Sequence, residues 1–131
     1  MNIIVDTCIW SLALRRAVLN QEKTSHQLRE LILEKRVVML GAIRQELLSG
    51  IIHKEQFEKL KTYLHAFSDF ALLQEDYEIA ADFFNVCRSK GIQGSNTDFL
   101  ICAAASRHHM SIFTNDNDFK IFSKILPIKL I

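Results

Sequence analysis

Short apolar runs alternate with longer segments of helical pattern along the whole chain, and this alternation restricts the folds it can adopt. Parallel strands need a crossover connection between them, and that connection is usually a helix. The alternation therefore predicts an α/β fold with three layers, in which helices cover both faces of a short, mainly parallel sheet. We expect strands at residues 2–6, 37–40, 70–73, 111–114 and 128–131.

Helices are predicted between these runs from the spacing of apolar residues and from capping residues. Ser25 is a candidate N-cap, and Gly91 can end a helix in the left-handed conformation. Ser95, Asn96 and Thr97 are cap-type residues that precede a strongly apolar segment. We expect helices within residues 8–16, 25–36, 42–51, 54–67, 75–91, 94–109 and 115–126.

The size and charge of the chain limit its organisation and its partners. Its 131 residues suffice for one domain with one hydrophobic core, and we interpret residues 1–131 as such a domain. The 16 basic and 15 acidic residues give a formal net charge of +1. This balance provides no overall attraction for nucleic acid, so an anionic partner must be bound by a local basic patch or through a metal ion.

The cysteines and the N-terminus indicate a cytoplasmic protein. Cys8, Cys87 and Cys102 are far apart and form no CxxC pair, so a cysteine cage for zinc is disfavoured and a reducing compartment is favoured. The N-terminal apolar run lacks a basic region before it and is interrupted by Asp6, which is not the pattern of a signal peptide. No apolar run is long enough to cross a bilayer, so we expect no membrane association.

Acidic residues recur where predicted strands end or where a buried helix begins. Asp6 ends the first strand, Asp98 lies in the first turn of the apolar helix, and Asp116 and Asp118 follow the strand at 111–114. Each has an ordinary explanation, since acids favour helix N-termini and Asp is common in turns. In parallel sheets, however, ligands bind beyond the carboxyl ends of the strands. We therefore expect these acids at one edge of the sheet.

Glu46 is a further candidate, in the helix that follows the second predicted strand. Ile43, Leu47 and Gly50 lie near it at helical spacing, which places it close to an apolar face. An ordinary solvated glutamate is the alternative, because Glu is seldom buried without a partner.

Carboxylates that gather at one edge repel each other and raise one another's pKa. Such a cluster is stable with a cation, and hard oxygen ligands select Mg²⁺ or Mn²⁺. These ions bind phosphates and activate water for in-line displacement. The acids thus predict a metal-dependent site for phosphodiester or phosphoryl-transfer chemistry.

Four segments carry a resemblance to the PIN domain family and, more narrowly, to the VapC toxins of bacterial toxin–antitoxin pairs. They are "NIIVDTCIWS", "RQELLSG", "SNTDFLICAAA" and "IFTNDNDF", in the family's order and over essentially the whole chain. The resemblance implies a compact three-layer α/β/α PIN-like fold and an endoribonuclease that depends on Mg²⁺ or Mn²⁺. It also implies a cognate VapB-like antitoxin that blocks the site, and a homodimer.

The resemblance also assigns the acids. Asp6, Glu46 and Asp98 match the first three acids of the family, and the fourth falls on Asp116 or, as the alternative in the same turn, on Asp118. It implies that Asp6, Asp98 and Asp116 hold the metal, with Glu46 a ligand directly or through water.

Supporting residues follow from the same motifs. Thr114 matches a family hydroxyl that supports the site, and Thr7 follows the first acid, where a hydroxyl residue is common. RNA would be held by local basic residues, whose ordinary role is solvation. The candidates are Arg15, Arg16, Arg44, Lys120 and Lys124.

Two other functions fit the chain less well. The first is a phosphotransfer domain with Asp6 as nucleophile or phospho-acceptor. The haloacid-dehalogenase type has a second Asp two residues after the first, where this chain has Cys8, and a response-regulator receiver has paired acids at the end of its first strand, where this chain has Val5 before Asp6. The other alternative is a PIN-like module that binds RNA or protein without catalysis. Members of that kind usually lose one or more acids, whereas this chain has an acid in each of the four motifs.

Overall fold

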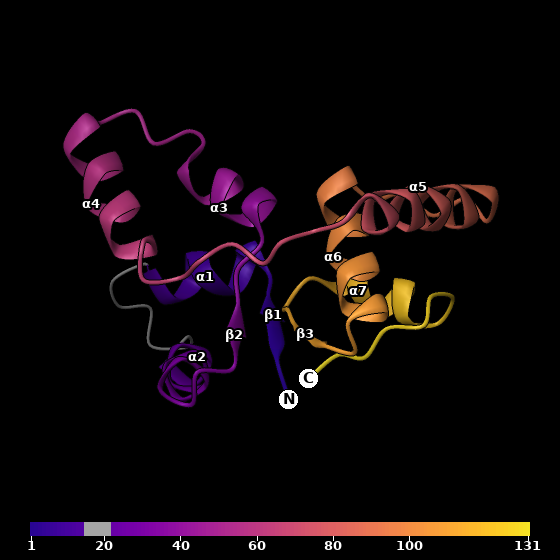
Figure 1. The fold of residues 1–131 in the computed structure, drawn as a ribbon, viewed down its shortest axis with the longest axis horizontal. Helices are drawn as coiled ribbons and strands as arrows, with labels where there is room; N and C mark the ends of the chain where they lie inside the picture. The colour runs from indigo at the N-terminus through magenta and orange to yellow at the C-terminus, as the bar shows by residue number, and fades with distance from the viewer. Residues whose placement is uncertain (15–21) are drawn as a thin grey trace.

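The computed structural model describes residues 1–14 and 22–131. Its centre is a parallel sheet of three strands, β1 (Ile3–Val5), β2 (Val37–Val38) and β3 (Ser111–Phe113), in the order β2-β1-β3. Ile4 of β1 lies opposite Val38 of β2 and Ile112 of β3 (Figure 1). The carboxyl ends of β1 and β3 therefore meet at the same edge of the sheet.

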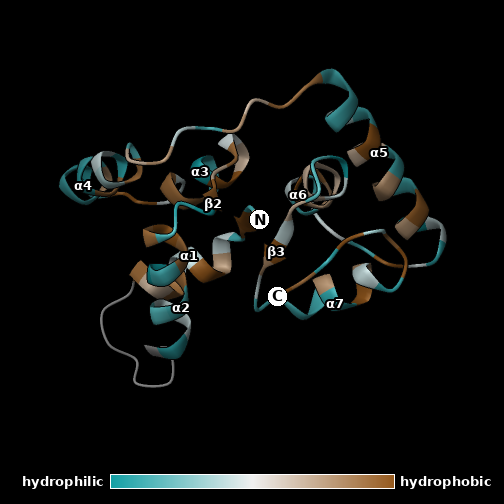
Figure 2. Cartoon of the chain, turned by 60° about the horizontal axis from the view of Figure 1, so that its bottom comes forward, coloured by the Kyte–Doolittle hydropathy of each residue, from teal (hydrophilic) through white to brown (hydrophobic). Residues whose placement is uncertain are grey.

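The strands form where short β-branched runs can be buried on both faces. Ile3, Ile4 and Val5 are all at most 1% exposed. Figure 2 shows the strands as hydrophobic segments at the centre of the molecule. The first strand of the predicted sheet is thus confirmed, and its apolar run ends where Asp6 begins the next element.

Helices flank the sheet on both sides. The side next to β2 holds α1 (Thr7–Leu14), α2 (Glu22–Leu33), α3 (Gly41–Leu48) and α4 (Lys54–Leu64). The side next to β3 holds α5 (Gln74–Ser89), α6 (Asn96–Arg107) and α7 (Asn117–Ser123) (Figure 1). The arrangement confirms the predicted three-layer α/β/α fold with a short parallel sheet. No helix in the described ranges is long and apolar enough to cross a membrane.

Helix α6, which has the largest set of buried residues among the described helices, packs against β1 and β3 as well as against α5. Every residue from Ile101 to Ala105 is at most 1% exposed, because small side chains let the helix approach the sheet closely. Its N-terminus, which carries Asp98, therefore lies near the strand ends. Gly91 closes the preceding helix as predicted, with a φ of 74°.

Three predicted elements differ from the structure. Residues 70–73 are not a strand, because only Asp69 forms a bridge, to Met39, and Leu73 is 55% exposed as the N-cap of α5. Residues 128–131 contribute one bridge, between Leu130 and Ile112, rather than a strand. Ser25 is not an N-cap, since α2 begins at Glu22.

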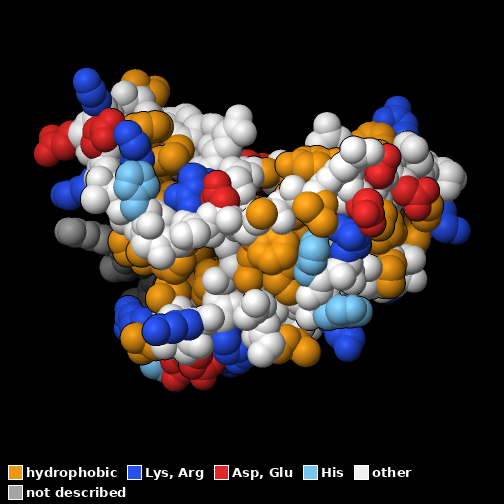
Figure 3. Space-filling model, in the orientation of Figure 1, with side chains coloured by type: hydrophobic (Ala, Val, Ile, Leu, Met, Phe, Trp, Pro, Cys, Tyr) orange, Lys and Arg blue, Asp and Glu red, His pale blue; other side chains and the backbone are white. Residues whose placement is uncertain are grey.

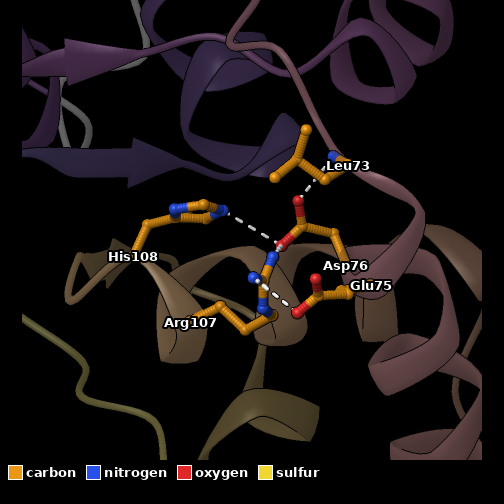
Figure 4. A network of polar contacts seen from close by, with 5 residues as sticks. All are labelled: Leu73, Glu75, Asp76, Arg107 and His108. Atoms are coloured by element: carbon orange, nitrogen blue, oxygen red, sulfur yellow. Dashed lines mark hydrogen bonds and ion pairs between the residues drawn. The ribbon is translucent and has the colours of Figure 1, made fainter.

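A polar network ties the start of α5 to the end of α6 (Figure 4). The buried carboxylate of Asp76 accepts hydrogen bonds from Leu73 N (2.7 Å) and Arg107 Nη1 (2.6 Å), and it lies 3.0 Å from His108 Nε2. Arg107 also pairs with Glu75 at 3.1 Å. Burial alone would raise the pKa of Asp76, but the donors of Leu73, Arg107 and His108 outweigh it and hold that pKa below its usual value.

Candidate functional site

Asp6 is the first residue after β1 and is only 5% exposed. Its backbone N–H donates to the carbonyl of Phe113 (2.9 Å), so the ends of β1 and β3 are joined at this point. Its own carbonyl accepts the N–H of Ile9 (3.0 Å) as α1 begins. The backbone of Asp6 thus connects the sheet edge to the first helix, and the side chain is held at that edge.

Both carboxylate oxygens of Asp6 accept hydrogen bonds. Thr7 N donates to Oδ1 (2.8 Å), while Thr114 Oγ1 (2.8 Å) and Cys8 Sγ (3.4 Å) donate to Oδ2. Buried carboxylates need such partners. Asp6 therefore satisfies the start of α1, as a capping residue would, and is also fixed in orientation by a hydroxyl at the end of the neighbouring strand β3.

Thr114 connects the acids that follow β1 and β3. Its hydroxyl donates to Asp6 and accepts the backbone N–H of Asp116 (3.0 Å). One hydroxyl thus fixes the direction of the Asp6 carboxylate and the path of the turn that carries Asp116. The predicted role of Thr114 as a supporting hydroxyl is compatible with these two bonds and stays a prediction.

The thiol of Cys8 lies inside the same group of side chains. Its Sγ is 3.5 Å from Thr114 Oγ1 and accepts the N–H of Asn115 (3.4 Å). Burial is the main cause that raises the pKa of Cys8, and the nearby Asp6 raises it further. The thiol is therefore a neutral packing and donor group. The sequence gives one sign of this position, because Cys8 lies two residues after Asp6 and in the first turn of a helix.

The two turn acids have different positions. Asp116 is the N-cap of α7, where its Oδ1 accepts the N–H of Asp118 (2.9 Å). Asp118 is exposed in the first turn. Asp116 rather than Asp118 therefore caps this helix, which begins one residue after Asp116. Asp116 is half-buried and lies next to Thr114, and hence closer to Asp6 through that hydroxyl.

Glu46 reaches the site through Thr7. The hydroxyl of Thr7 donates to Glu46 Oε1 at 2.7 Å, which joins α1 to α3. Ile43 and Leu47 are buried on the inner face of α3, and Glu46 itself remains exposed. An exposed glutamate that a hydroxyl orients toward the strand ends is available to solvent and to ligands.

Asp98 occupies the third position of α6 and forms a reciprocal capping pair with Ser95. Asp98 N donates to Ser95 Oγ and Ser95 N donates to Asp98 Oδ2, both at 3.0 Å. The pKa of Asp98 is raised, first by burial and then by the charges of Asp6 and Asp116, against the lowering effect of the Ser95 hydrogen bonds. The three acids are therefore close enough to act on one another electrostatically.

The metal-binding arrangement itself is not formed in the described ranges, where no group of three or more Asp, Glu, His or Cys side chains is arranged as a ligand set. The carboxylates are instead engaged by Thr114, Thr7 and Ser95. Carboxylate and hydroxyl oxygens are nevertheless the donors that Mg²⁺ and Mn²⁺ prefer. Burial is the main cause that raises the pKa of Asp98, and the charges of Asp6 and Asp116 add to it. A cation would relieve the repulsion between these charges, so the residues fit such an ion chemically.

The basic residues that were predicted to bind RNA differ in their surroundings. Arg44 pairs with Asp69 (2.9 Å) and donates to the carbonyls of Leu64 (3.0 Å) and Phe67, so it joins α3 to the segment after α4. These bonds favour a structural role for Arg44. Lys120 is exposed on α7, and Lys124 is exposed as the C-cap of that helix. Arg15 and Arg16 lie outside the described residues.

The surface is hollowed beside the strand ends. Figure 3 shows a notch between the side that carries α3 and α4 and the side that carries α5 and α6, with acidic atoms visible at its base. An extended polymer can reach acids in such a notch more easily than acids in a closed cavity.

Comparison with known proteins gives one family and several similar structures. The family model described as PIN domain matches residues 3–125. No curated protein matches the chain in sequence.

Solved structures are similar over nearly their full length. FitAcB from Neisseria gonorrhoeae has a TM-score of 0.78 at 20% identity, over 98% of this chain and 96% of that chain. VapBC2 from Rickettsia felis, bound to a DNA fragment from its promoter, has a TM-score of 0.77 at 21% identity, over 100% and 98%. FitAB bound to the IR36 DNA fragment has a TM-score of 0.68 at 20% identity, over 98% and 93%. At these identities the likeness concerns the fold.

Proposed function

Because the chain belongs to the PIN domain family, we propose that it is a metal-dependent endoribonuclease and the toxin of a VapBC-type toxin–antitoxin pair. The observation that carries this proposal is the geometry at the strand ends, where the hydroxyl of Thr114 bonds both the carboxylate of Asp6 and the backbone of Asp116. Acids that repel one another at the carboxyl edge of a parallel sheet need a cation, and a cation there suits phosphodiester chemistry.

In this proposal Asp6, Asp98 and Asp116 hold Mg²⁺ or Mn²⁺. When bound, the ion supplies an activated water and stabilises charge on the phosphate. Thr114 keeps the Asp6 carboxylate and the Asp116 turn in place. Thr7 directs Glu46 toward the same edge as a direct or water-mediated ligand. Asp118 stays a secondary candidate.

RNA is bound by cations around the notch. Lys120 is a candidate because it is exposed on the helix that Asp116 caps, and Lys124 is exposed at the end of that helix. Arg15 and Arg16 remain proposals from the sequence. Arg44 is the weakest candidate because its guanidinium is already bonded to Asp69 and to two carbonyls.

The partners follow from the similar structures, which are named as complexes of VapBC and FitAB type, two of them with DNA. We propose a VapB-like antitoxin for this chain, together with a homodimer and a cytoplasmic site of action for a single domain. Leu33, Ile52 and Tyr63 leave apolar surface exposed on the side of α2 and α4, at 76%, 91% and 48%. Such surface is typical of an interface with another chain.

A binding module without catalysis is the second candidate. One observation favours it, namely that the described acids do not form a closed ligand set. Under this alternative, the chain would bind RNA or protein through the same notch and would not cut RNA whether or not metal is added.

The deciding experiment is a cleavage assay on structured RNA with added Mn²⁺ or Mg²⁺ and with a chelator. We expect cleavage by the wild type with metal only, and none by Asp6→Asn. Asp82→Asn is the matched control, because Asp82 is an exposed acid on α5 outside the site, and it should cut like the wild type. RNA binding without metal-dependent cleavage would favour the binding module.

A further inference from the structure

A cavity of about 430 Å³ lies between α5 and α6, outside the group of acids. These two helices pack against each other. The cavity falls within the size range of ~300–1,000 Å³ that is usual for small-molecule sites. Its chemically distinctive lining residues are Tyr77, Phe84, Asn85, Asn96, Thr97 and Phe99.

The cavity is next to the candidate catalytic acids. Asn96 and Thr97 are the first two residues of α6 and directly precede Asp98. Because a helix rises about 1.5 Å per residue, this end of the cavity lies within one turn of the Asp98 backbone. A ligand that occupies the cavity would therefore lie beside the proposed cleavage site.

The lining suits a planar ring with polar edges. The rings of Phe84 and Phe99 meet edge to face with centroids 5.5 Å apart, and Tyr77 is 55% exposed at the rim. Asn85 and Asn96 are exposed and carry amides, which both donate and accept hydrogen bonds. Among the described lining residues none is charged, so a phosphate is a poor occupant.

A cation nevertheless lies beside the cavity. The guanidinium of Arg88 is 5.8 Å from the centre of the Phe84 ring. An aromatic surface, amide edges and a neighbouring cation together match one nucleotide of single-stranded RNA, whose base stacks on rings and whose edge is read by amides.

We propose that this cavity receives one base of the RNA substrate and thereby sets a base preference near the cleaved phosphate. The proposal rests on the proposed function, since it names how the same site selects its substrate. Tyr77 supplies the exposed stacking surface, Asn85 reads the edge of the base, and Phe84 and Phe99 form the apolar floor.

The test has two independent parts. First, the four uncharged nucleosides are titrated against the protein without metal, and backbone amide shifts are followed by NMR. Wild type should show shifts confined to α5 and the first turns of α6 for at least one nucleoside. Tyr77→Leu should weaken that binding by about tenfold or more, because base–aromatic stacking is lost. Tyr63→Leu is the matched control, since Tyr63 is a similarly exposed tyrosine on α4.

Second, cleavage sites are mapped on a pool of randomised RNA with Mn²⁺. Wild type should prefer particular bases at one position near the cut, and Tyr77→Leu and Asn85→Ala should still cut but lose that preference. Cleavage with an unchanged preference in both variants, and no nucleoside shifts, would overturn the cavity proposal alone. Nucleoside shifts at α5 and α6 without any cleavage would support a base site and sink the proposed nuclease function.

The surface could instead join two copies of the chain. In that case Tyr77→Leu would convert a dimer into a monomer in analytical ultracentrifugation, and nucleosides would not shift the α5 amides. This result would overturn the proposal, whereas an unchanged mass with nucleoside shifts supports it.

Discussion

The hydroxyl of Thr114 donates a 2.8 Å hydrogen bond to Oδ2 of Asp6, across the two strand ends that carry these residues. The same hydroxyl oxygen accepts the N–H of Asp116. Thr114 thus acts on both acids without being an acid itself. Residues that orient ligands in this way typically affect metal affinity or activity by 10–100-fold.

Thr114→Val should therefore lower RNA cleavage by about 10–100-fold while the protein stays folded. Loss of the hydrogen bond should cost about 1 kcal/mol of unfolding free energy. The measurement is kcat/KM on RNA together with denaturant unfolding. Thr62→Val on the exposed face of α4 is the control and should change neither quantity. If Thr114→Val cuts at the wild-type rate, the hydroxyl does not position the acids.

The roles of Asp116 and Asp118 can be distinguished by removing one charge at a time. Asp116→Asn should abolish cleavage, whereas Asp118→Asn should only weaken it, because Asp116 lies next to Thr114 and Asp118 is exposed. Asn is also a good N-cap, so Asp116→Asn should leave the stability of α7 nearly unchanged. Melting curves test the second point and gel-based cleavage tests the first. If Asp118→Asn is inactive and Asp116→Asn is active, the fourth acid of the site is Asp118 rather than Asp116.

The elements that the sequence predicts correctly are those in which local pattern and burial agree. The run before Asp6 is β-branched and enters a buried strand, and the small residues of α6 pack on the sheet. Residues 70–73 are equally apolar, but they form a connection that leaves the sheet after the bridge at Asp69 and ends as the N-cap of α5. A run of four apolar residues does not distinguish these two outcomes.

In the candidate site, too, the features that follow from local sequence were predictable and those that depend on distant contacts were not. Asp6, Asp98 and Asp116 could be selected as candidates from the sequence because each follows a strand or opens a buried helix, which is a local property. The role of Arg44 was not predictable, since it depends on Asp69, 25 residues away, and on carbonyls at the end of α4. The choice of cap in the turn also escaped prediction, because Asp116 and Asp118 are chemically identical and only the start of α7 separates them.

The network around Asp76 predicts a pH-dependent contribution to stability. Asp76→Ala should lower the unfolding free energy at pH 7 by about 2 kcal/mol, because the N–H of Leu73 and the cation of Arg107 lose a buried acceptor. The pKa of Asp76 is lowered in the folded state. The stability that Asp76 contributes is therefore present above about pH 4, the pKa of an Asp in the unfolded chain, and is lost as the pH falls through the pKa of Asp76 in the folded protein.

The check is urea unfolding of wild type and Asp76→Ala between pH 7 and pH 2, with Asp82→Ala as an exposed control on the same helix. The difference between wild type and Asp76→Ala should shrink as the solution becomes more acidic. A difference that is constant over this range would mean that packing, rather than the charge of Asp76, holds α5 against α6.

The exposed apolar side chains on α2 and near α4 predict a symmetric homodimer. Leu28 and Leu31 are buried within the chain, whereas Leu33 is 76% exposed and Ile52 is 91% exposed. Light scattering at micromolar concentration should give twice the mass of one chain, and Leu33→Lys should reduce it by placing a charge in the interface. Lys59→Glu, an exposed change on α4, is the control for altered surface charge. A monomer in the wild type without antitoxin contradicts the prediction.

Burial is the main cause that raises the pKa of Asp98, and the charge of Asp6 at the end of its strand raises that pKa further. A raised pKa means that ionised Asp98 costs folding free energy. The stability that Asp98 contributes is fully present below about pH 4, the pKa of an Asp in the unfolded chain, and is lost as the pH rises through the pKa of Asp98 in the folded protein. Asp6→Asn should relieve the part of this cost that comes from the charge of Asp6, so that the metal-free variant melts no lower than wild type at pH 7. Mn²⁺ should raise the melting temperature of wild type, because only the folded chain gathers the acids, and should raise that of Asp6→Asn much less. An equal rise in both proteins, or continued RNA cleavage by Asp6→Asn, would show that Asp6 only caps α1 and that the metal binds elsewhere.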